Sequence, residues 1–412
     1  MNYVIIGNSI AAVGCIEAIR RLDPDSPITV VGSETHHVYS RPLISYLLKG
    51  ATDRERMKYR PDSFYADNRV AALLGKTATR IDPRGKTVTV EDGKILPYDK
   101  LLVATGSAPF VPPMEGLDEV KPKTSFMTLD DAARLEGMLG PQKRVLILGA
   151  GLIGLKCAEG IAGRVGSVTL VDLAPRVLPS VLDEKGAALV QAHLEQHGLS
   201  FRLGDAVESF CGGNTAVLKS GAQLEFDILV VAVGVRPCVQ LVKDAGGEVG
   251  RGIAVDAHCQ TSLPDVYAAG DCCECYDITA GQSRVLAVLP NAYMGGETAG
   301  TNMAGGESVF DAAMPLNAVG FFGLSMTTAG NCAEGETYVV EDGCSYKKLV
   351  WHGDLLRGFI LIGNVERAGI YTSLIRRKTP LSTIDFDLIK DKPQLMAFTK
   401  EVRRLELGGK QA

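Results

Sequence analysis

The stretch RVLILGAGLIG, residues 144–154, decides the fold of this 412-residue chain. Its first half is an apolar run of the kind that forms a buried strand. Gly149, Gly151 and Gly154 follow at the spacing G-x-G-x-x-G, directly before a predicted helix. Such glycines permit a tight turn and let the backbone approach a pyrophosphate, which the N-terminus of the helix attracts. The stretch therefore predicts a Rossmann-type dinucleotide site.

The next predicted strand, residues 167–171, ends at Asp172. An acid at this position can accept hydrogen bonds from both hydroxyls of an adenine ribose and repels a 2′-phosphate, so NAD(H) is favoured over NADP(H). Arg176 lies close by and could pair with such a phosphate if Asp172 turned away. The residues expected to bind NAD(H) are Gly149, Gly151, Leu152, Ile153, Gly154, Asp172 and Gly234.

A second unit of this design opens the chain at residues 3–13, YVIIGNSIAAV. It also reads as strand, turn and helix, but only the first glycine of the fingerprint, Gly7, is present, with Ser9 and Ala12 at the other two positions. Small side chains there still admit a nearby pyrophosphate and close helix packing. After a predicted strand over residues 28–31, Glu34 stands where an acid would take the ribose hydroxyls.

Three further segments complete a pattern. Residues 98–107 close the first unit, residues 226–237 close the second in nearly the same way, and residues 261–271 form a predicted strand that ends in Gly270-Asp271. With the two fingerprints, this order resembles the pyridine-nucleotide-dependent flavoprotein reductases, the group with glutathione reductase, NADH oxidases and ferredoxin or rubredoxin reductases. The resemblance covers the whole chain.

The resemblance implies an α/β fold with two Rossmann-like domains of the glutathione reductase type and a small α+β C-terminal interface domain. The implied FAD domain is discontinuous, with residues 1–112 and 238–309. The NAD domain, residues 113–237, is inserted between them, and the interface domain spans residues 310–412.

The resemblance also assigns roles at the FAD site. Asp271 is expected to hydrogen-bond the ribityl chain, and a helix that begins near Leu289 is expected to direct its N-terminus toward the flavin pyrimidine, where its dipole favours negative charge. The residues expected to contact FAD are Gly7, Ser9, Ile10, Ala11, Glu34, Arg41, Pro42, Ala78, Thr105, Gly106, Gly270, Asp271, Asn291 and Ala292.

The absence of a cysteine soon after the first fingerprint indicates which branch of the flavoprotein reductases the chain resembles. Disulfide reductases of this fold carry a Cys-x4-Cys pair soon after the first fingerprint, and NADH peroxidases and oxidases carry one redox cysteine in this region. Residues 38–46, VYSRPLISY, contain no cysteine. The pattern Tyr-x-Arg-Pro-x-x-Ser resembles ferredoxin, rubredoxin and nitrite reductase flavoproteins instead. The alternative interpretation is that Arg41-Pro42 only begins a helix over residues 43–48.

One departure from the group concerns Tyr46 and Lys156. Relatives commonly have a lysine at the first place and a glutamate at the second, paired beside flavin N5. We hypothesise that Lys156 supplies a positive charge near N5 from the opposite side and favours the reduced flavin. The alternative is a solvated lysine on a helix surface.

The ten cysteines are mostly scattered in apolar stretches and are expected to pack as small hydrophobes. Only Cys272, Cys273 and Cys275 cluster, directly after Asp271. No second pair at metal-site spacing accompanies them, so packing is favoured over a metal site or a redox disulfide, and no metal is expected.

Composition narrows the class further. A net charge of −5 offers no basic surface for nucleic acid, and the apolar runs are shorter than the roughly 20 residues of a membrane helix. Because a strand begins at Tyr3 with no signal-like segment before it, we expect a cytoplasmic protein.

The expected reaction is hydride transfer between nicotinamide C4 and flavin N5, followed by one-electron exchange with an iron–sulfur partner. That partner is either a rubredoxin- or ferredoxin-type carrier or the other subunits of a larger iron–sulfur or molybdenum/tungsten oxidoreductase. A homodimer or hetero-oligomer is expected through the C-terminal domain. The alternatives are an NADH oxidase- or peroxidase-like enzyme that reduces a small molecule, and a non-enzymatic flavin-binding redox sensor.

Overall fold

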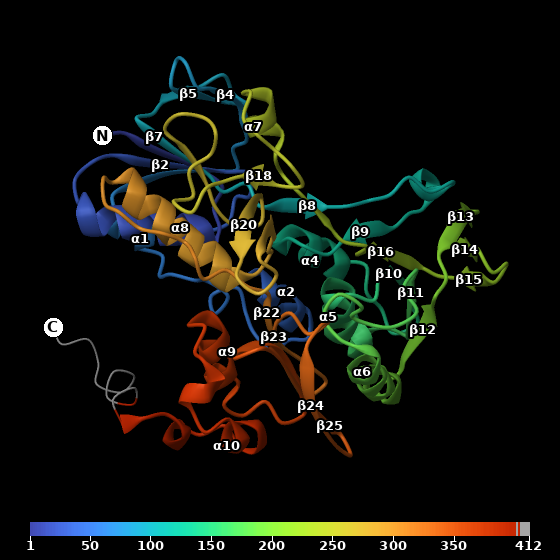
Figure 1. The fold of residues 1–412 in the computed structure, drawn as a ribbon. Coiled ribbons are helices and arrows are strands. Elements are labelled where there is room, and N and C mark those ends of the chain that lie inside the picture. The colour runs from blue at the N-terminus through green and yellow to red at the C-terminus, as the bar shows by residue number, and fades with distance from the viewer. Residues whose placement is uncertain (401–402, 404–412) are drawn as a thin grey trace. The chain divides into compact units, whose positions relative to one another are not determined.

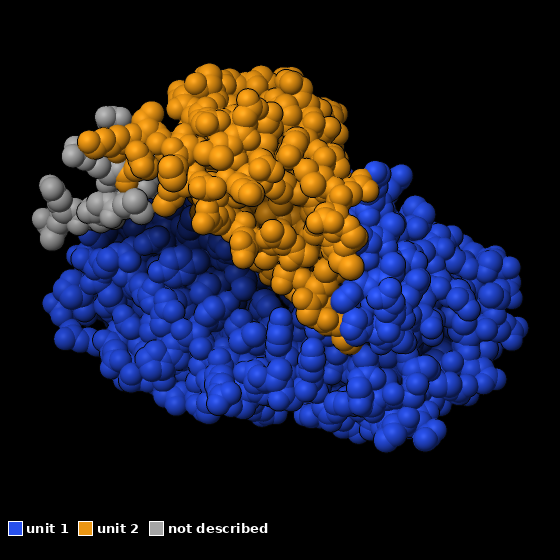
Figure 2. Space-filling view, turned by 90° about the horizontal axis from the view of Figure 1, so that it is seen from below, with its two compact units in different colours: residues 1–275, 284–310 blue, residues 276–283, 311–412 orange. Residues whose placement is uncertain are grey.

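A computed structural model of the chain describes residues 1–400 and 403. The chain divides into two compact units, which Figure 2 colours separately. Unit 1 comprises Met1–Cys275 and Arg284–Phe310, and unit 2 comprises Tyr276–Ser283 and the chain from Asp311 onward. Within the described residues, no helix is both long enough and apolar enough to cross a membrane.

The first parallel sheet of unit 1 is built on β1, the strand that precedes the Gly7 turn. Every residue of β1 is buried, as expected for a strand covered on both faces. Residues Val266–Ala268 pair with Leu101–Val103, so segments far apart in the sequence share one sheet. The strand order is β19 (Val266–Ala268), β7 (Lys100–Val103), β1 (Tyr3–Ile6), β2 (Ile28–Gly32) and β3 (Val70–Leu74).

Two helices pack closely beside this sheet. These are α1 (Ile10–Leu22) and α8 (Leu289–Met303), which lie side by side in Figure 1. Their approach depends on glycine, because a Cβ at Gly296 would stand 2.0 Å from the carbonyl oxygen of Ala11. Helix α8, from residues 238–309, is thereby held against α1, the helix of the first fingerprint.

The second parallel sheet repeats the design around β10, the strand that precedes the Gly149 turn. Its order is β12 (Leu199–Leu203), β11 (Ser167–Asp172), β10 (Arg144–Leu148), β16 (Ile228–Val231) and β9 (Lys123–Ser125). The associated helices are α4 (Leu129–Glu136), α5 (Leu152–Ile161) and α6 (Glu184–Gln196).

The smaller elements that follow belong to unit 1, except for the part of β20 and β21 that falls within Tyr276–Ser283 of unit 2. A two-stranded ribbon pairs β8 (Ser107–Pro109) with β17 (Val235–Pro237), which lie at the ends of the two repeated motifs. The antiparallel sheets are β4 (Ala78–Asp82), β5 (Thr87–Val90) and β6 (Ile95–Pro97), and β13 (Val207–Cys211), β14 (Thr215–Leu218) and β15 (Gln223–Glu225). A mixed sheet contains β18 (Ile253–Ala254), β20 (Cys273–Asp277) and β21 (Gln282–Val285), and the short helices are α2 (Ile44–Leu48), α3 (Phe64–Asp67) and α7 (Gln240–Asp244).

Unit 2 is an antiparallel sheet with helices. Its core contains Phe359, Leu361, Tyr371 and Leu374, all at most 1% exposed. The strand order is β22 (Leu316–Phe321), β23 (Leu324–Gly330), β26 (Leu355–Ile362), β25 (Ser345–His352) and β24 (Glu336–Asp342), and the helices are α9 (Ala368–Arg376) and α10 (Phe386–Asp391).

The predicted fold class is therefore confirmed: two parallel α/β sheets, each built on a glycine turn, and a C-terminal α+β part. Residues 1–112, 113–237 and 238–309, which the sequence assigns to the FAD and NAD domains, lie in unit 1 except for Tyr276–Ser283. The individual domain boundaries stay a prediction.

Candidate functional site

The Gly149 turn has the geometry of a phosphate-binding loop. Gly149 has φ +106°, and a Cβ there would stand 2.3 Å from the carbonyl oxygen of Ala232. A Cβ at Gly154 would stand 2.0 Å from the carbonyl oxygen of Gly149. Gly151 differs, because no atom lies within 4 Å of the place its Cβ would take. Two of the glycines thus shape the turn, and Gly151 opens it to a ligand.

The helix behind this turn offers its amides. Gly151 is the N-cap of α5 and provides no side chain to bind the first N–H groups, which begin at Leu152 and Ile153. Gly234, with φ +116° and open space around it, lies just beyond the end of β16, the neighbour of β10. These residues meet at the carboxyl edge of the sheet, where ligands bind in folds of this kind.

Asp172 lies at the same edge, as the last residue of β11. One carboxylate oxygen accepts the Ala150 N–H at 2.6 Å and the other accepts the Ala174 N–H at 2.8 Å. Since a carboxylate has about four acceptor positions, these bonds orient it and still leave room for ribose hydroxyls. Arg176 follows in the loop, and its buried Nε has no hydrogen-bond partner among the described residues.

The Gly7 turn repeats the geometry despite its incomplete fingerprint. Gly7 has φ +114°, and a Cβ there would stand 2.0 Å from the carbonyl oxygen of Ala104. Ser9 is the N-cap of α1, yet its side chain does not bind the helix N–H groups that follow at Ile10 and Ala11. The helix N-terminus is therefore open to a phosphate in the same way.

Three segments converge beside this turn. A Cβ at Gly270 would lie 3.4 Å from that of Ala11 and 3.7 Å from that of Ala292. The structure thus brings together the first fingerprint, the Gly270-Asp271 motif and the start of α8, as an FAD site would need. Thr105 donates a hydrogen bond from its hydroxyl to the Cys238 carbonyl at 2.7 Å, which orders the turn before Gly106.

The carboxylate of Asp271 is the acceptor expected to bind the ribityl chain of FAD. Burial raises its pKa, and the positive charge of Arg41 opposes that rise. No described residue donates a hydrogen bond to it. A partly buried carboxylate needs hydrogen-bond donors from water or from a ligand, and the hydroxyls of a ribityl chain are suitable donors. The residues present therefore fit FAD.

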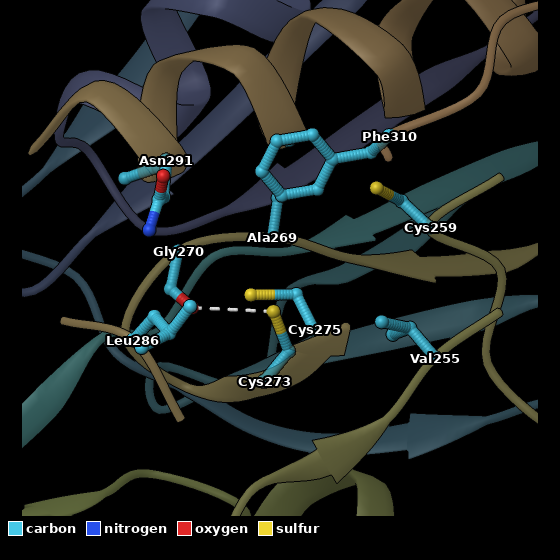
Figure 3. A pocket seen from close by; sticks show the side chains of 11 residues that line it. Val255, Cys259, Ala269, Gly270, Cys273, Cys275, Leu286, Asn291 and Phe310 are labelled. Atoms are coloured by element: carbon cyan, nitrogen blue, oxygen red, sulfur yellow. Dashed lines mark hydrogen bonds between the residues drawn. The ribbon is translucent and has the colours of Figure 1, made fainter. Parts of the chain in front are cut away.

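The cysteine cluster lies under this site. Cys273 and Cys275 of the cluster, together with Cys259, line a cavity of about 10 Å³ that Gly270, Asn291 and Ala292 also line. In Figure 3, Asn291 and Phe310 lie above the cavity, and Cys273, whose thiol donates to the Gly270 carbonyl at 3.2 Å, lies below it. The buried cysteines are Cys15, Cys157, Cys259, Cys272, Cys273 and Cys275.

Burial also controls the chemistry of these thiols. It raises the pKa of Cys272 to about 11 and that of Cys273 well above its usual range. Because the thiolate is the reactive form, both are poor nucleophiles at neutral pH. Among the described residues, no group of three or more His, Cys, Asp or Glu side chains is placed to hold a metal ion.

Glu34 occupies the predicted place at the end of β2, but its carboxylate is already engaged. It accepts the Tyr39 hydroxyl at 2.6 Å and Arg41 Nη2 at 2.5 Å. The Tyr39 hydroxyl in turn accepts the Leu129 N–H at 2.9 Å, and Arg41 Nη1 donates to the Met127 carbonyl at 3.3 Å. These contacts fasten the loop to the segment that begins α4, and the ribose role of Glu34 stays a prediction.

Two other predicted contacts have plain positions. Pro42 lies in the 3-10 turn Arg41–Leu43 that leads into α2. Ala78 is 8% exposed and belongs to a core with Ile6 and Val31, beneath the first sheet. Neither position tests a contact with FAD.

A polar network beside the Gly7 turn was not predicted. Tyr65 donates its hydroxyl to Asn8 Oδ1 at 2.8 Å, and the Asn8 amide donates to the His36 carbonyl at 3.2 Å. The ring of His37 lies 4.7 Å from that of Tyr65, and its Nε2 is buried without a partner among the described residues. Asn8 within the fingerprint was a possible signal, whereas nothing in the sequence marked Tyr65.

Helices α2 and α5 pack against each other and join the segment after the first fingerprint to the helix of the second one. A Cβ at Gly160 on α5 would stand 2.8 Å from the Ser45 carbonyl oxygen on α2. Beside this crossing, Lys156 Nζ lies 4.3 Å from the centre of the Tyr46 ring. Lys156 is half-buried and is also paired with Glu159, and its role beside the flavin stays a prediction.

Comparison with known proteins gives a consistent result. The family described as pyridine nucleotide-disulphide oxidoreductase matches residues 1–296. The NADH-dependent phenylglyoxylate dehydrogenase subunit epsilon of Aromatoleum evansii is 33% identical over 394 residues, which are 93% of this chain and 93% of that protein. The rubredoxin-NAD(+) reductase of Pseudomonas putida is 31% identical over 74% of this chain and 80% of its own length.

A solved structure shows the same fold. The putidaredoxin reductase in its covalent complex with putidaredoxin aligns with a TM-score of 0.87 and 23% identity. The alignment covers 100% of this chain and 99% of that one.

Proposed function

The chain belongs to the pyridine nucleotide-disulphide oxidoreductase family, and we propose that it is an FAD-dependent oxidoreductase that exchanges a hydride with NAD(H) and single electrons with an iron–sulfur protein. One observation carries this proposal. Two open glycine turns of matching geometry, at Gly7 and Gly149, each stand at the carboxyl edge of a parallel sheet, and the first lies beside the donorless carboxylate of Asp271.

FAD, once bound, supplies the ability to convert a two-electron exchange with nicotinamide into single-electron steps. The chain's own residues bind and orient it. The N-terminus of α1 would face the pyrophosphate and Asp271 would accept hydrogen bonds from the ribityl hydroxyls, while Asn291 at the start of α8 lines the same cavity as Gly270. At the Gly149 turn, the N-terminus of α5 and the carboxylate of Asp172 would hold NAD(H).

Lys156 is the residue that we assign to flavin tuning. It lies at the crossing of α2 and α5, between the segment expected to contact FAD and the helix expected to bind NAD(H). A cation held there with 14% of its side chain exposed acts through a low dielectric. It stabilises negative charge that develops on the reduced flavin and so raises the reduction potential.

The electron acceptor follows from two features. The segment that leads into α2 contains no thiol, and the cysteines closest to Gly270 are protonated at neutral pH, so a thiol relay has no support. The relatives include a rubredoxin reductase and a subunit of an NADH-dependent dehydrogenase. Both a small iron–sulfur carrier and the iron–sulfur subunits of a larger complex fit this chemistry.

The alternative is a small-molecule acceptor such as dioxygen or peroxide, as in an NADH oxidase. The cytoplasmic location, the domain boundaries and the oligomeric state stay predictions.

An anaerobic titration with NADH tests the proposal. The protein, purified with its flavin, should lose the visible absorbance of oxidised FAD on addition of NADH, and that absorbance should return when an oxidised iron–sulfur protein is added. If NADH does not bleach the flavin, the chain is a flavin-binding scaffold and the proposal is wrong. If only dioxygen restores the colour, the oxidase alternative is correct.

A further inference from the structure

Glu159 is a buried carboxylate at the crossing of α2 and α5. Only 6% of its side chain is exposed. One of its oxygens pairs with Lys156, one turn earlier on α5, and the other accepts from Lys49 Nζ at 3.2 Å. Lys49 follows directly after α2, so Glu159 joins the two helices through opposite charges.

The burial of this group has an energetic consequence. Removing a carboxylate from water is unfavourable unless cations and hydrogen bonds compensate for the lost hydration. Here two ammonium groups do so, and the three side chains together carry one net positive charge. Glu159 therefore offsets part of the positive charge of Lys156.

The position of Lys156 is fixed from two sides. Its ammonium group pairs with Glu159 on its own helix and lies 4.3 Å from the centre of the Tyr46 ring on α2. A cation over an aromatic face is attracted by the negative charge of the ring face. Glu159 and Tyr46 together thus hold the charge between the two halves of unit 1.

We propose that Glu159 is a positioning residue for the flavin, which sets both the place and the effective strength of the Lys156 charge. It acts through Lys156 and does not need to touch the cofactor. This inference rests on the proposed function, because it requires FAD beside the crossing. It predicts that the charge state at position 159 is read out in the flavin reduction potential.

Glu159→Gln tests the inference, because it keeps the size of the side chain and removes its charge. The measurement is the FAD reduction potential of the holoprotein, determined by equilibration with a redox dye and a chemical reductant. The expected result is a higher potential than in the parent, since Lys156 is no longer offset. Lys156→Met should lower the potential. In the Lys156→Met background, Glu159→Gln should shift the potential by less than it does in the parent.

Glu17→Gln is the matched control. Glu17 is also a partly buried carboxylate paired with a cation, Arg60, at 2.6 Å, but it lies on α1. Its substitution should leave the potential unchanged. The inference is overturned if Glu159→Gln lowers only the melting temperature while the potential stays that of the parent, or if its shift is the same with and without Lys156.

A second variant protects the test against misfolding. Lys49→Met leaves the Lys156–Glu159 pair in place and removes one cation from the crossing, so it should lower the potential by less than Lys156→Met. An equal or larger effect overturns the assignment of the dominant charge to Lys156. Because the chemical reductant replaces NADH, these results stand apart from the proposed function, which fails only if NADH does not reduce the flavin.

Discussion

The ammonium nitrogen of Lys156 lies 4.3 Å from the centre of the Tyr46 ring. Tyr46 belongs to α2, which follows the Arg41-Pro42 turn, and Lys156 belongs to α5, which follows the second fingerprint. The contact therefore joins the two nucleotide-binding halves. Where the sequences that this chain resembles have a lysine and a glutamate, this chain has an aromatic ring and a lysine, with the carboxylate of Glu159 one turn further along.

Tyr46 should stabilise the fold through its ring and not through its hydroxyl. The hydroxyl makes no hydrogen bond with the described residues, whereas the ring face contacts a cation. Tyr46→Phe should leave the free energy of unfolding within about 0.5 kcal/mol of the parent, and Tyr46→Leu should lower it by about 1–2 kcal/mol. Urea denaturation of the two variants measures this difference, and equal stabilities would contradict the cation–π assignment.

The glycines of the second turn should separate folding from binding. Gly151→Ala adds a methyl group where no atom lies within 4 Å, so the melting temperature should stay near that of the parent while the KM for NADH rises. Gly154→Ala forces a Cβ to within 2.0 Å of the Gly149 carbonyl oxygen and should lower the melting temperature. An unchanged KM in folded Gly151→Ala would argue against nucleotide binding at this turn.

Asp172 should determine the preference for NADH. Replacing it with alanine removes the acceptor for the ribose hydroxyls and the charge that repels a 2′-phosphate. The ratio of kcat/KM for NADH to that for NADPH should fall by about tenfold or more. Asp227→Asn is the control, because Asp227 pairs with Arg144 at the opposite end of the sheet and should leave this ratio unchanged.

Asp271 should oppose folding when no flavin is bound. Burial raises its pKa, so its ionisation destabilises the folded chain. This penalty is absent below the ordinary aspartate pKa of about 4, grows as the pH rises to the folded-state pKa, and is complete above it. Asp271→Asn should therefore raise the free energy of unfolding of the flavin-free protein more at neutral than at acidic pH.

The holoprotein should show the opposite effect of that substitution. Asp271→Asn replaces a charged acceptor of hydroxyl groups with a neutral one, which should weaken FAD retention by about tenfold. Equilibrium dialysis of the flavin measures this. Tighter retention, or a stability gain that does not depend on pH, would contradict the role of Asp271.

The glycine turns could be predicted because their geometry depends on local sequence. The strand expected from Tyr3 to Ile6 and the strand over Arg144–Leu148 have the observed bounds, and both turns have the left-handed glycine that the motif requires. In the Arg41 region, the alternative interpretation of Arg41-Pro42 places a helix over residues 43–48. The structure begins with a 3-10 turn at Arg41–Leu43, because the proline fixes the backbone before α2 starts.

The side-chain partners could not be predicted in the same way. Glu34 was interpreted as a ribose acceptor from its place after β2, but Arg41 and Tyr39 occupy its carboxylate. That arrangement depends on how the loop reaches Leu129, which is a long-range contact without a local pattern. Glu159 was missed for the same reason, since only the crossing of α2 and α5 brings Lys49 to it.

The most direct test of electron transfer from NADH to an iron–sulfur protein, without a thiol relay, is to measure reduction of that protein under anaerobic conditions. The holoprotein is used either untreated or with its accessible thiols completely alkylated beforehand. Each form is then mixed with NADH and an oxidised rubredoxin or ferredoxin. The iron–sulfur protein should be reduced, with twice as many acceptor molecules reduced as NADH oxidised, and alkylation should leave the rate unchanged. An acceptor that stays oxidised while NADH is consumed on admission of dioxygen, or a reaction abolished by alkylation, would contradict this prediction.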